Sequence, residues 1–382
     1  MSGYTETVRE LSASIDALAA GVLGDGQTVV ELHRQLERLS AVVAKAVAAF
    51  DAGGSWEADG ARTAAAWVGT RCRLPLGVAR RRVSLGRSLR HMGRVEAAWL
   101  AGEIGEAQVE VLAQARQPGT EEAFERDERL LVAQAAELRY SHFCRAVAYW
   151  RHLNDPDGVE DEAEAQHAAR RLHVSETFGG VRVIDGVLDP IGGGIFAAAL
   201  RKIEDELFAA DWAEARGRVG EGVRATDLSR APSQRRADAL VEMARRAGAV
   251  PEGARIPEPL VTVLVGYETL AGRVCELANG TVVSPGSVLR LLDQSWVERV
   301  VFDGPDRVMG VGVRRRFFDG ATRRAIEVRD RECFSQFCEA PASHCEVDHV
   351  RPWSAGGLTT QANGQLACGY HNRWRSRRRG PP

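Results

Sequence analysis

A short segment near the end of the chain gathers side chains that bind metal ions or transfer protons. In order, they are Cys333, Cys338, Cys345, Asp348, His349, Asn363, Cys368, His371 and Asn372. Thiolates and imidazole nitrogens bind zinc, whereas carboxylate and amide oxygens suit harder ions such as Mg²⁺ or Mn²⁺. An imidazole also accepts a proton near neutral pH. Two kinds of chemistry are therefore present in one segment.

Four of these residues have the spacing of a structural zinc site. Cys333 and Cys338 form a C-x4-C pair, and Cys368 and His371 form a C-x2-H pair. Such spacings let a turn present two ligands to one tetrahedral ion. Because the segment has few large apolar residues, the metal would supply folding free energy on the order of 10 kcal/mol. We predict a structural Zn²⁺ on these four residues and a packed thiol at Cys345, with a fifth zinc ligand as its alternative role.

The remaining polar residues form a second set with harder ligands and a base. Asp348 offers a carboxylate, Asn363 and Asn372 offer amide oxygens, and His349 offers an imidazole beside the carboxylate. Neighbouring side chains of a strand point to opposite faces, so Asp348 and His349 can serve one metal and one water only where the strand ends or twists. The pattern predicts strand, turn, strand and helix, with the helix beginning near Cys368.

The stretch from Arg324 to Arg375 resembles the HNH endonucleases. It contains "CEVDHVRPWSAGGLTTQANGQLACGYHN", which is similar to the actinobacterial 13E12 repeat family, where an HNH domain follows a long helical domain of unknown function. The segment "LDPIGGGIFAAAL" is similar to that helical domain. The resemblance implies a ββα-metal, treble-clef-like fold that is stabilised by zinc, and it implies hydrolysis of phosphodiester bonds.

The resemblance also implies a role for each catalytic residue. His349 would be the general base that activates water, and Asp348 and Asn372 would hold the catalytic Mg²⁺ or Mn²⁺. Asn363 would brace the loop and fix the tautomer of His349. The four zinc ligands keep the assignment given above. Gly364 stands where the family usually has a large apolar residue, which predicts that the second strand packs loosely.

The distribution of charge assigns nucleic-acid contact to the same end of the chain. Residues 314–382 contain thirteen arginines and seven acidic residues, a net charge of +6, whereas the whole chain carries −2. Arginine-rich segments bind phosphate, and a solvated tail is the alternative for "RWRSRRRGPP". DNA is therefore the predicted partner. The predicted contacts are Arg351, Arg373, Arg375 and Arg377.

The rest of the chain must position this segment, and most of it has helical periodicity. Apolar residues recur every three or four positions through "TVVELHRQLERLSAVVAKAVAAF" and through later segments. Alternating apolar residues around a Gly-Gly turn predict one hairpin near 171–188. We predict a mainly α domain over 1–250, a small α+β connector over 251–318, and an HNH nuclease domain with a basic tail over 319–382.

Composition limits the class of protein. The 382 residues are 45% hydrophobic and 27% charged, and no apolar run is long enough to cross a membrane. The start of the chain lacks a signal-peptide pattern, which predicts a cytoplasmic protein with no membrane contact. We therefore predict a metal-dependent DNA endonuclease. The alternatives are a zinc-stabilised nucleic-acid-binding protein without turnover and a mobile-element or partner-binding scaffold; the sequence does not indicate an oligomeric state.

Overall fold

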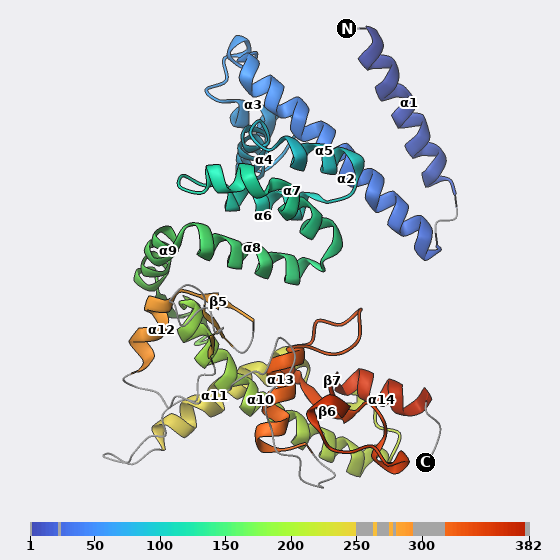
Figure 1. Ribbon diagram of the computed structural model, residues 1–382, viewed down its shortest axis with the longest axis vertical. Helices are drawn as coiled ribbons and strands as arrows, with labels where there is room; N and C mark the ends of the chain where they lie inside the picture. The colour runs from blue at the N-terminus through green and yellow to red at the C-terminus, as the bar shows by residue number, and fades with distance from the viewer. Residues whose placement is uncertain are drawn as a thin grey trace. The chain divides into compact units, whose positions relative to one another are not determined.

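The computed structural model describes residues 2–21, 24–249, 263–265, 275–277, 280–292 and 318–378. The chain divides into two compact units, Met1–Asp155 and Pro156–Pro382. The described parts of both units are mainly helical, and the described sheets are short and antiparallel (Figure 1). No described helix is both long and apolar enough to cross a membrane. The predicted limit at residue 250 and most of the predicted connector lie outside the described residues, so the three domain ranges stay predictions.

Helices account for nearly all regular structure described in the first unit. They are α1 (Ser2–Ala19), α2 (Gly26–Gly53), α3 (Ala64–Arg71), α4 (Leu76–Leu89), α5 (Gly93–Ala101), α6 (Glu106–Ala115), α7 (Glu121–Glu137) and α8 (Tyr140–Asn154). Local chemistry sets their ends. Asp25 caps α2 by accepting a hydrogen bond from the backbone N–H of Thr28, and Gly102 ends α5 in the left-handed conformation.

The core of the first unit combines buried aromatic rings with a buried carboxylate. Trp99, Phe124 and Phe143 are almost completely buried in it. Glu128 is also buried, and its carboxylate accepts hydrogen bonds from the backbone N–H groups of Arg94 and Val95 at the start of α5. The first N–H groups of a helix have no partner within the helix, so this carboxylate satisfies two of them.

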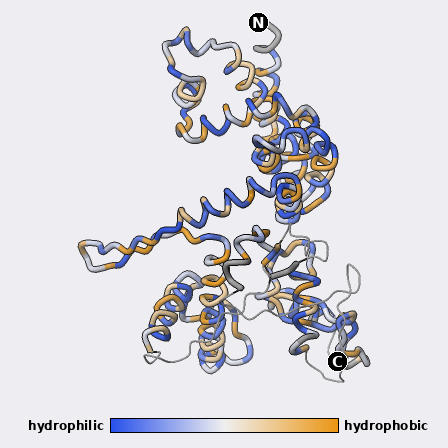
Figure 2. Tube along the Cα trace, turned by 60° about the vertical axis from the view of Figure 1, so that its left-hand side comes forward, coloured by the Kyte–Doolittle hydropathy of each residue, from blue (hydrophilic) through white to orange (hydrophobic). Residues whose placement is uncertain are grey.

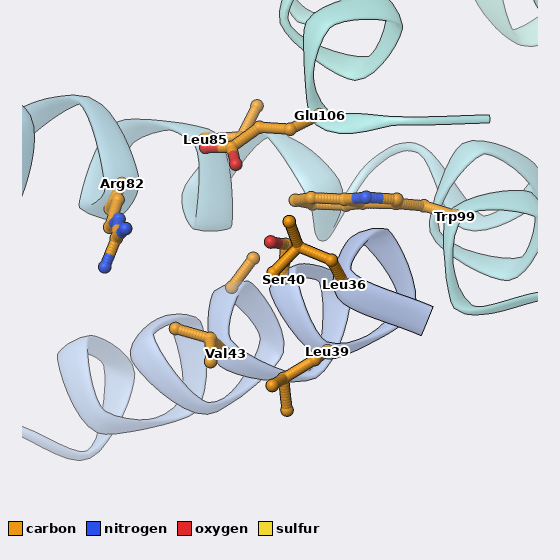
Figure 3. A pocket seen from close by; sticks show the side chains of 9 residues that line it. Leu36, Leu39, Ser40, Val43, Arg82, Leu85, Trp99 and Glu106 are labelled. Atoms are coloured by element: carbon orange, nitrogen blue, oxygen red, sulfur yellow. The ribbon is translucent and has the colours of Figure 1, made fainter. Parts of the chain in front are cut away.

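A small pocket opens between α2, α4, α5 and α6, and Figure 3 shows the side chains around it. The lining residues are Leu36, Leu39, Ser40, Val43, Ala44, Arg82, Leu85, Trp99 and Glu106. Its volume is about 140 Å³. Sites for small molecules and cofactors usually measure roughly 300–1,000 Å³, so this pocket is not the candidate functional site.

The second unit begins with a helix, a hairpin and two long helices. These are α9 (Pro156–Ala168), β1 (Arg171–Glu176), β2 (Arg182–Val187), α10 (Pro190–Val219) and α11 (Pro232–Gly248). The strands β1 and β2 pair antiparallel in the range where alternation predicts a hairpin. A short sheet in the order β3-β4-β5 follows, and then α12. Their bounds are Val263–Val265, Cys275–Leu277, Val282–Val283 and, for α12, Pro285–Leu292.

The end of the second unit contains the segment with metal-binding residues. It comprises α13 (Gly320–Asp330), β6 (Cys345–His349), β7 (Gly364–Cys368) and α14 (Gly369–Arg378). The antiparallel register places Cys345 opposite Cys368 and His349 opposite Gly364. The order of elements is therefore hairpin and then helix, with α13 packed against β7.

The expectation that the second strand packs loosely is wrong. A Cβ atom at Gly364 would lie 2.3 Å from Cδ1 of Ile326 and 2.8 Å from a ring carbon of Phe318. Leu366 of the same strand is completely buried. The missing side chain at Gly364 is thus replaced by Phe318 and Ile326, which come from outside the hairpin and fill the space.

A buried ion pair connects α10 to α11 and the loop before it. Asp211 of α10 is only 2% exposed, and its carboxylate accepts hydrogen bonds from Nε of Arg230 at 3.0 Å and Nε of Arg235 at 2.9 Å. The hydrogen bonds from Arg230 hold the pKa of Asp211 below its usual value, although burial acts in the opposite direction. The pair therefore favours the charged carboxylate in the folded state.

Replacing Asp211 with Asn should destabilise the second unit by about 3–5 kcal/mol, because it leaves the buried guanidinium of Arg235 without its anion and leaves Arg230 with Asp238 alone. Since the folded pKa is lowered, the contribution of Asp211 is complete above the usual Asp pKa and is lost as pH falls through the lowered value. Urea unfolding of both proteins between pH 7 and pH 3 should therefore show a difference that shrinks toward acid.

Asp238 provides the matched control. It also accepts a hydrogen bond from Arg230, but its side chain is 54% exposed. Asp238→Asn should change the free energy of unfolding by less than about 1 kcal/mol, as is usual for surface pairs. Equal effects of the two substitutions would contradict the assignment of Asp211 as the structural anion.

Candidate metal centre

Three cysteines and one histidine converge at the end of the second unit. The ligand atoms of Cys333, Cys338, Cys368 and His371 all lie within 4.8 Å of one another. Individual separations are 3.9 Å between the sulfurs of Cys338 and Cys368 and 3.2 Å between Sγ of Cys368 and Nδ1 of His371. Ligands bound at about 2.0–2.3 Å around a tetrahedral ion are separated by roughly 3.3–3.8 Å. The set predicted from spacing therefore has the size and chemistry of a zinc site.

Two separate elements supply the four ligands. Cys333 and Cys338 lie in the turn after α13, where the backbone N–H of Cys338 donates to the carbonyl of Ser335. Cys368 ends β7, and His371 lies in the first turn of α14. The backbone N–H of Cys368 donates to Sγ of Cys333 at 3.4 Å, the kind of contact that stabilises a thiolate. A metal at this position would connect the turn to the hairpin and its helix.

Cys345 lies near this set but is not one of its four members. Burial raises the pKa of Cys345 to about 12, and the nearby thiols of Cys333 and Cys368 act in the same direction. The thiol of Cys345 lies 3.5 Å from the carbonyl oxygen of Ala340. For Cys368, hydrogen bonds such as that from the backbone N–H of His371 outweigh burial, and its pKa lies below the usual value. Burial raises the pKa of Cys338 as well, so the protonation of the thiols does not distinguish Cys338 from Cys345. The burial of Cys345 outside the four-residue set is what fits a packed thiol.

His349 ends β6 and is buried beside two aromatic rings. Its ring centroid lies 4.5 Å from that of Phe318 and 5.9 Å from that of Trp353. Nε2 lies 2.9 Å from the hydroxyl oxygen of Thr359. Burial lowers the pKa of His349, and the charge of Asp348 opposes this. The imidazole is therefore neutral near pH 7, which is the form that a general base requires.

Asp348 contacts a different element from its neighbour. Nη1 of Arg375 donates to Oδ2 of Asp348 at 3.0 Å, and Nδ2 of Asn372 donates to Oε2 of Glu346 at 2.6 Å. Residues two apart on a strand share one face, so Glu346 and Asp348 both face α14. The structure thus brings Asp348 and Asn372 to the same surface and adds Glu346, which the sequence interpretation did not include. The signal that could have identified Glu346 is its position two residues before Asp348, on the same face of the strand.

Asn363 holds the loop between β6 and β7. Its amide oxygen accepts a hydrogen bond from the backbone N–H of Arg351 at 2.8 Å, and its amide nitrogen donates to the carbonyls of Leu358 and Arg351. Gly357 lies inside this loop, where a Cβ atom would lie only 1.9 Å from the carbonyl oxygen of Arg351. Asn363 therefore braces the loop that carries Thr359, the hydroxyl partner of His349.

The predicted DNA contacts differ in their surroundings. Arg351 and Arg373 are exposed. The side chain of Arg375 is 15% exposed, donates to Asp348 and to the carbonyl of Val350, and lies over the ring of Phe334. The side chain of Arg377 lies outside the described part of the chain. Arg375 is thus situated beside the candidate catalytic carboxylate, a place that its position in the basic tail did not indicate.

Zinc content provides the test of the ligand set. Cys333→Ser should reduce bound zinc well below one ion per chain, because it removes a thiolate that is 3% exposed at the centre of the cluster. Cys345→Ser should leave the zinc content near that of the wild type, since its thiol is outside the set. Both values can be measured by mass spectrometry of the purified proteins, and the reverse result would overturn the choice of ligands.

Comparisons with known proteins identify the family of the chain but not its activity. The mycobacterial protein MT1183, from Mycobacterium tuberculosis (strain CDC 1551 / Oshkosh), is 27% identical over 272 residues, which cover 64% of this chain and 57% of the relative. Mb1179c of Mycobacterium bovis (strain ATCC BAA-935 / AF2122/97) is 26% identical over 271 residues, with the same shares. Both are described as uncharacterized, and the match with this chain spans little more than half of their length.

The family match covers most of the chain and ends before the Cys/His cluster. No solved structure matches the chain. A family model described as "Domain of unknown function (DUF222)" matches residues 27–330. Its range ends at Asp330, so it includes the helical part but none of the four residues of the cluster. Because the match spans far more than half of the sequence, the chain belongs to the DUF222 family.

Proposed function

We propose that the chain is a metal-dependent DNA endonuclease whose C-terminal residues, 319–382, form a zinc-stabilised HNH module of the ββα-metal type. Support comes from the order of β6, β7 and α14 and from the Cys/His cluster that connects them to the turn after α13. The resemblance of this segment to HNH endonucleases agrees with that order. The family match to the helical part is compatible with such a module and does not by itself indicate an activity.

The observation that carries the proposal is that two adjacent residues of α14 belong to different sites. His371 belongs to the Cys/His cluster, whereas the next residue, Asn372, contacts Glu346 on β6. One turn of helix therefore connects a structural site to a surface of oxygen donors. A protein that only bound nucleic acid would not require a buried, neutral imidazole at His349 beside such a surface.

In the proposed mechanism, His349 accepts the proton of the attacking water. The hydroxyl of Thr359 fixes the orientation of the imidazole ring, and Phe318 fills the space beneath it. Asp348 and Asn372 carry the oxygen atoms that suit Mg²⁺ or Mn²⁺. When bound there, such an ion would neutralise charge on the scissile phosphate and on the leaving oxygen. Arg375 would have to release Asp348 or share it with the ion.

A basic and aromatic surface on α14 supports DNA as the substrate. Tyr370, Trp374 and Arg378 follow one another at intervals of four, so they share one face of the helix, which we call the α14 outer face. Tyr370 is 65% exposed and Trp374 is 41% exposed, and the guanidinium of Arg378 lies 4.7 Å from the ring of Trp374. The helix contains no acidic residue. Arginine for phosphate and aromatic rings for bases are the groups that bind nucleic acid.

The cleavage proposal is tested with plasmid DNA in the presence of Mg²⁺ or Mn²⁺. His349→Ala should lower the rate of nicking by a factor on the order of 100 or more, the usual contribution of a general base. His33→Ala, which removes an exposed histidine of the first unit, should behave like the wild type and controls for a general effect of replacing a histidine. Equal nicking by wild type and His349→Ala would contradict the mechanism. Binding without cleavage by the wild type would favour the alternative of a zinc-stabilised DNA-binding protein without turnover.

The contact surface is tested by binding alone, in a His349→Ala background. Tyr370→Ala should weaken binding of a labelled DNA oligonucleotide by about tenfold, because one stacking contact is worth about 1–3 kcal/mol. Tyr140→Ala removes an equally large ring that is 48% exposed on α8 and should leave the affinity within about twofold. Fluorescence anisotropy measures both. An unchanged affinity in Tyr370→Ala would remove the α14 outer face from the interface.

A further inference from the structure

The hairpin formed by β1 and β2 is exposed along its whole length. Every residue of Arg171–Glu176 and of Arg182–Val187 is exposed, and so is the turn between them. In Figure 2 it is the two-stranded arm at the left. Polar and apolar residues alternate along β1, whereas Val183 and Ile184 are adjacent in β2. Phe178, in the turn, is fully exposed. The hairpin thus presents both of its faces to solvent.

The register sorts the side chains into one apolar and one mixed face. Opposite residues of an antiparallel pair lie on the same face. Leu172 pairs with Gly186, Val174 with Ile184, and Glu176 with Arg182. We call the surface made by the first four of these residues the apolar face. The opposite face is mixed. β1 contributes the polar residues Arg171, His173 and Ser175, and β2 contributes Val183, Asp185 and Val187.

The two charged residues beside the apolar face neutralise each other. Glu176 and Arg182, at the end near the turn, form an ion pair with a separation of 2.6 Å. Arg182 is therefore neutralised locally and does not make the face attractive to the phosphates of a nucleic acid. Like charges that face each other across an interface cost free energy, and two copies of a face without net charge avoid this cost.

Gly186 leaves room for atoms of the neighbouring strand β1. A Cβ atom at this position would lie 2.8 Å from the carbonyl oxygen of Arg171 and 3.0 Å from Cδ1 of Leu172. The side chain of Leu172 therefore lies across the glycine. A glycine inside a strand weakens it and often marks a position where another backbone comes near. Here the backbone that comes near is that of Arg171 in β1, and the side chain of Leu172 covers the position of the glycine on the apolar face.

An isolated two-stranded hairpin is at best marginally stable in water, and an exposed contiguous apolar surface often marks an interaction site. Leu172, Val174, Ile184 and Phe178 together offer on the order of 600 Å² of surface, so that two copies facing each other would cover about 1,200 Å², the lower end of specific interfaces. Oligomers of one chain most often have two-fold symmetry, in which the same patch is used twice.

We propose that two copies of this chain pair through the hairpin, with the apolar face of one copy packed on the apolar face of the other around a two-fold axis. The pairing surface contains none of the residues assigned to the zinc cluster or to catalysis. It is therefore independent of the proposed nuclease activity. Phe178 extends the contact beyond the strands at each end.

Two adjacent residues of β2 provide a matched pair of variants. Ile184 is 53% exposed on the apolar face, and Val183 is 49% exposed on the mixed face. Ile184→Lys places a charge in the proposed interface and should raise the dissociation constant of the dimer at least tenfold. Val183→Lys adds the same charge one residue away and should change it less than about threefold. Analytical ultracentrifugation of the full chain over a range of concentrations measures both.

The wild-type protein decides the question even if a variant fails to fold. A wild type that remains monomeric up to about 100 μM would overturn the proposal, since it would show that the apolar face is covered in another way or not at all. Equal dissociation constants for Ile184→Lys and Val183→Lys would show that the dimer uses another surface. Zinc content near one per chain in both variants verifies that the remote part of the second unit is folded.

Discussion

The Cys/His cluster is the constraint on which the candidate site depends, because the segment around it has so little other core. The buried apolar cluster of this segment consists of Phe318, Ile326, Cys333, Cys345 and Leu366, and two of these five are cysteines. Small cores of this kind seldom give a stable fold without a disulfide or a metal. Four ligands from two elements would fix the turn after α13 to the end of β7 and the start of α14. The position of Asn372 against β6 follows from that attachment.

The same constraint explains why two kinds of chemistry fit in one short segment. The soft ligands gather where the turn meets α14, and the oxygen donors lie on the face of β6 that contacts the helix. His349, one residue after Asp348, is directed instead toward Phe318 and Thr359. Strand alternation thus directs the imidazole and the carboxylate to different sides of β6. In the proposed mechanism, the two would act on one substrate where the strand ends.

Local chemistry was readable from the sequence, and contacts between distant elements were not. The four residues of the Cys/His cluster could be identified from the sequence because the members of each pair are close along the chain, so spacing alone constrains them. Thr359 and Phe318 carry no such signal, because their nearness to the site depends on how the loop between β6 and β7 and the residues before α13 pack against His349. The prediction of loose packing at Gly364 was wrong for the same reason. A glycine leaves a gap only when no side chain from another element fills the space beside it.

The periodicity of apolar residues also did not predict the buried polar groups of the helical parts. The apolar repeats indicate which helix faces are buried, but they do not indicate that Glu128 satisfies the start of α5 or that Asp211 pairs with Arg230 and Arg235. Charged residues are normally assigned to the surface. Such a carboxylate becomes recognisable only when the helices that supply its donors are seen together. The alternation of apolar and polar residues in the hairpin, by contrast, predicted two strands. It did not predict that both faces of the hairpin are exposed.

The two proposals are compatible through symmetry. A two-fold axis relates two copies of the chain in the same way that the dyad of duplex DNA relates its antiparallel strands. Each proposed nuclease module has a single base, His349, and one set of oxygen donors, so one module is suited to one phosphodiester bond. Pairing through the β1–β2 hairpins would supply a second module of inverted orientation. The exposed hairpin, which has no role in the chemistry of a single copy, would then determine whether one strand or both strands are cut.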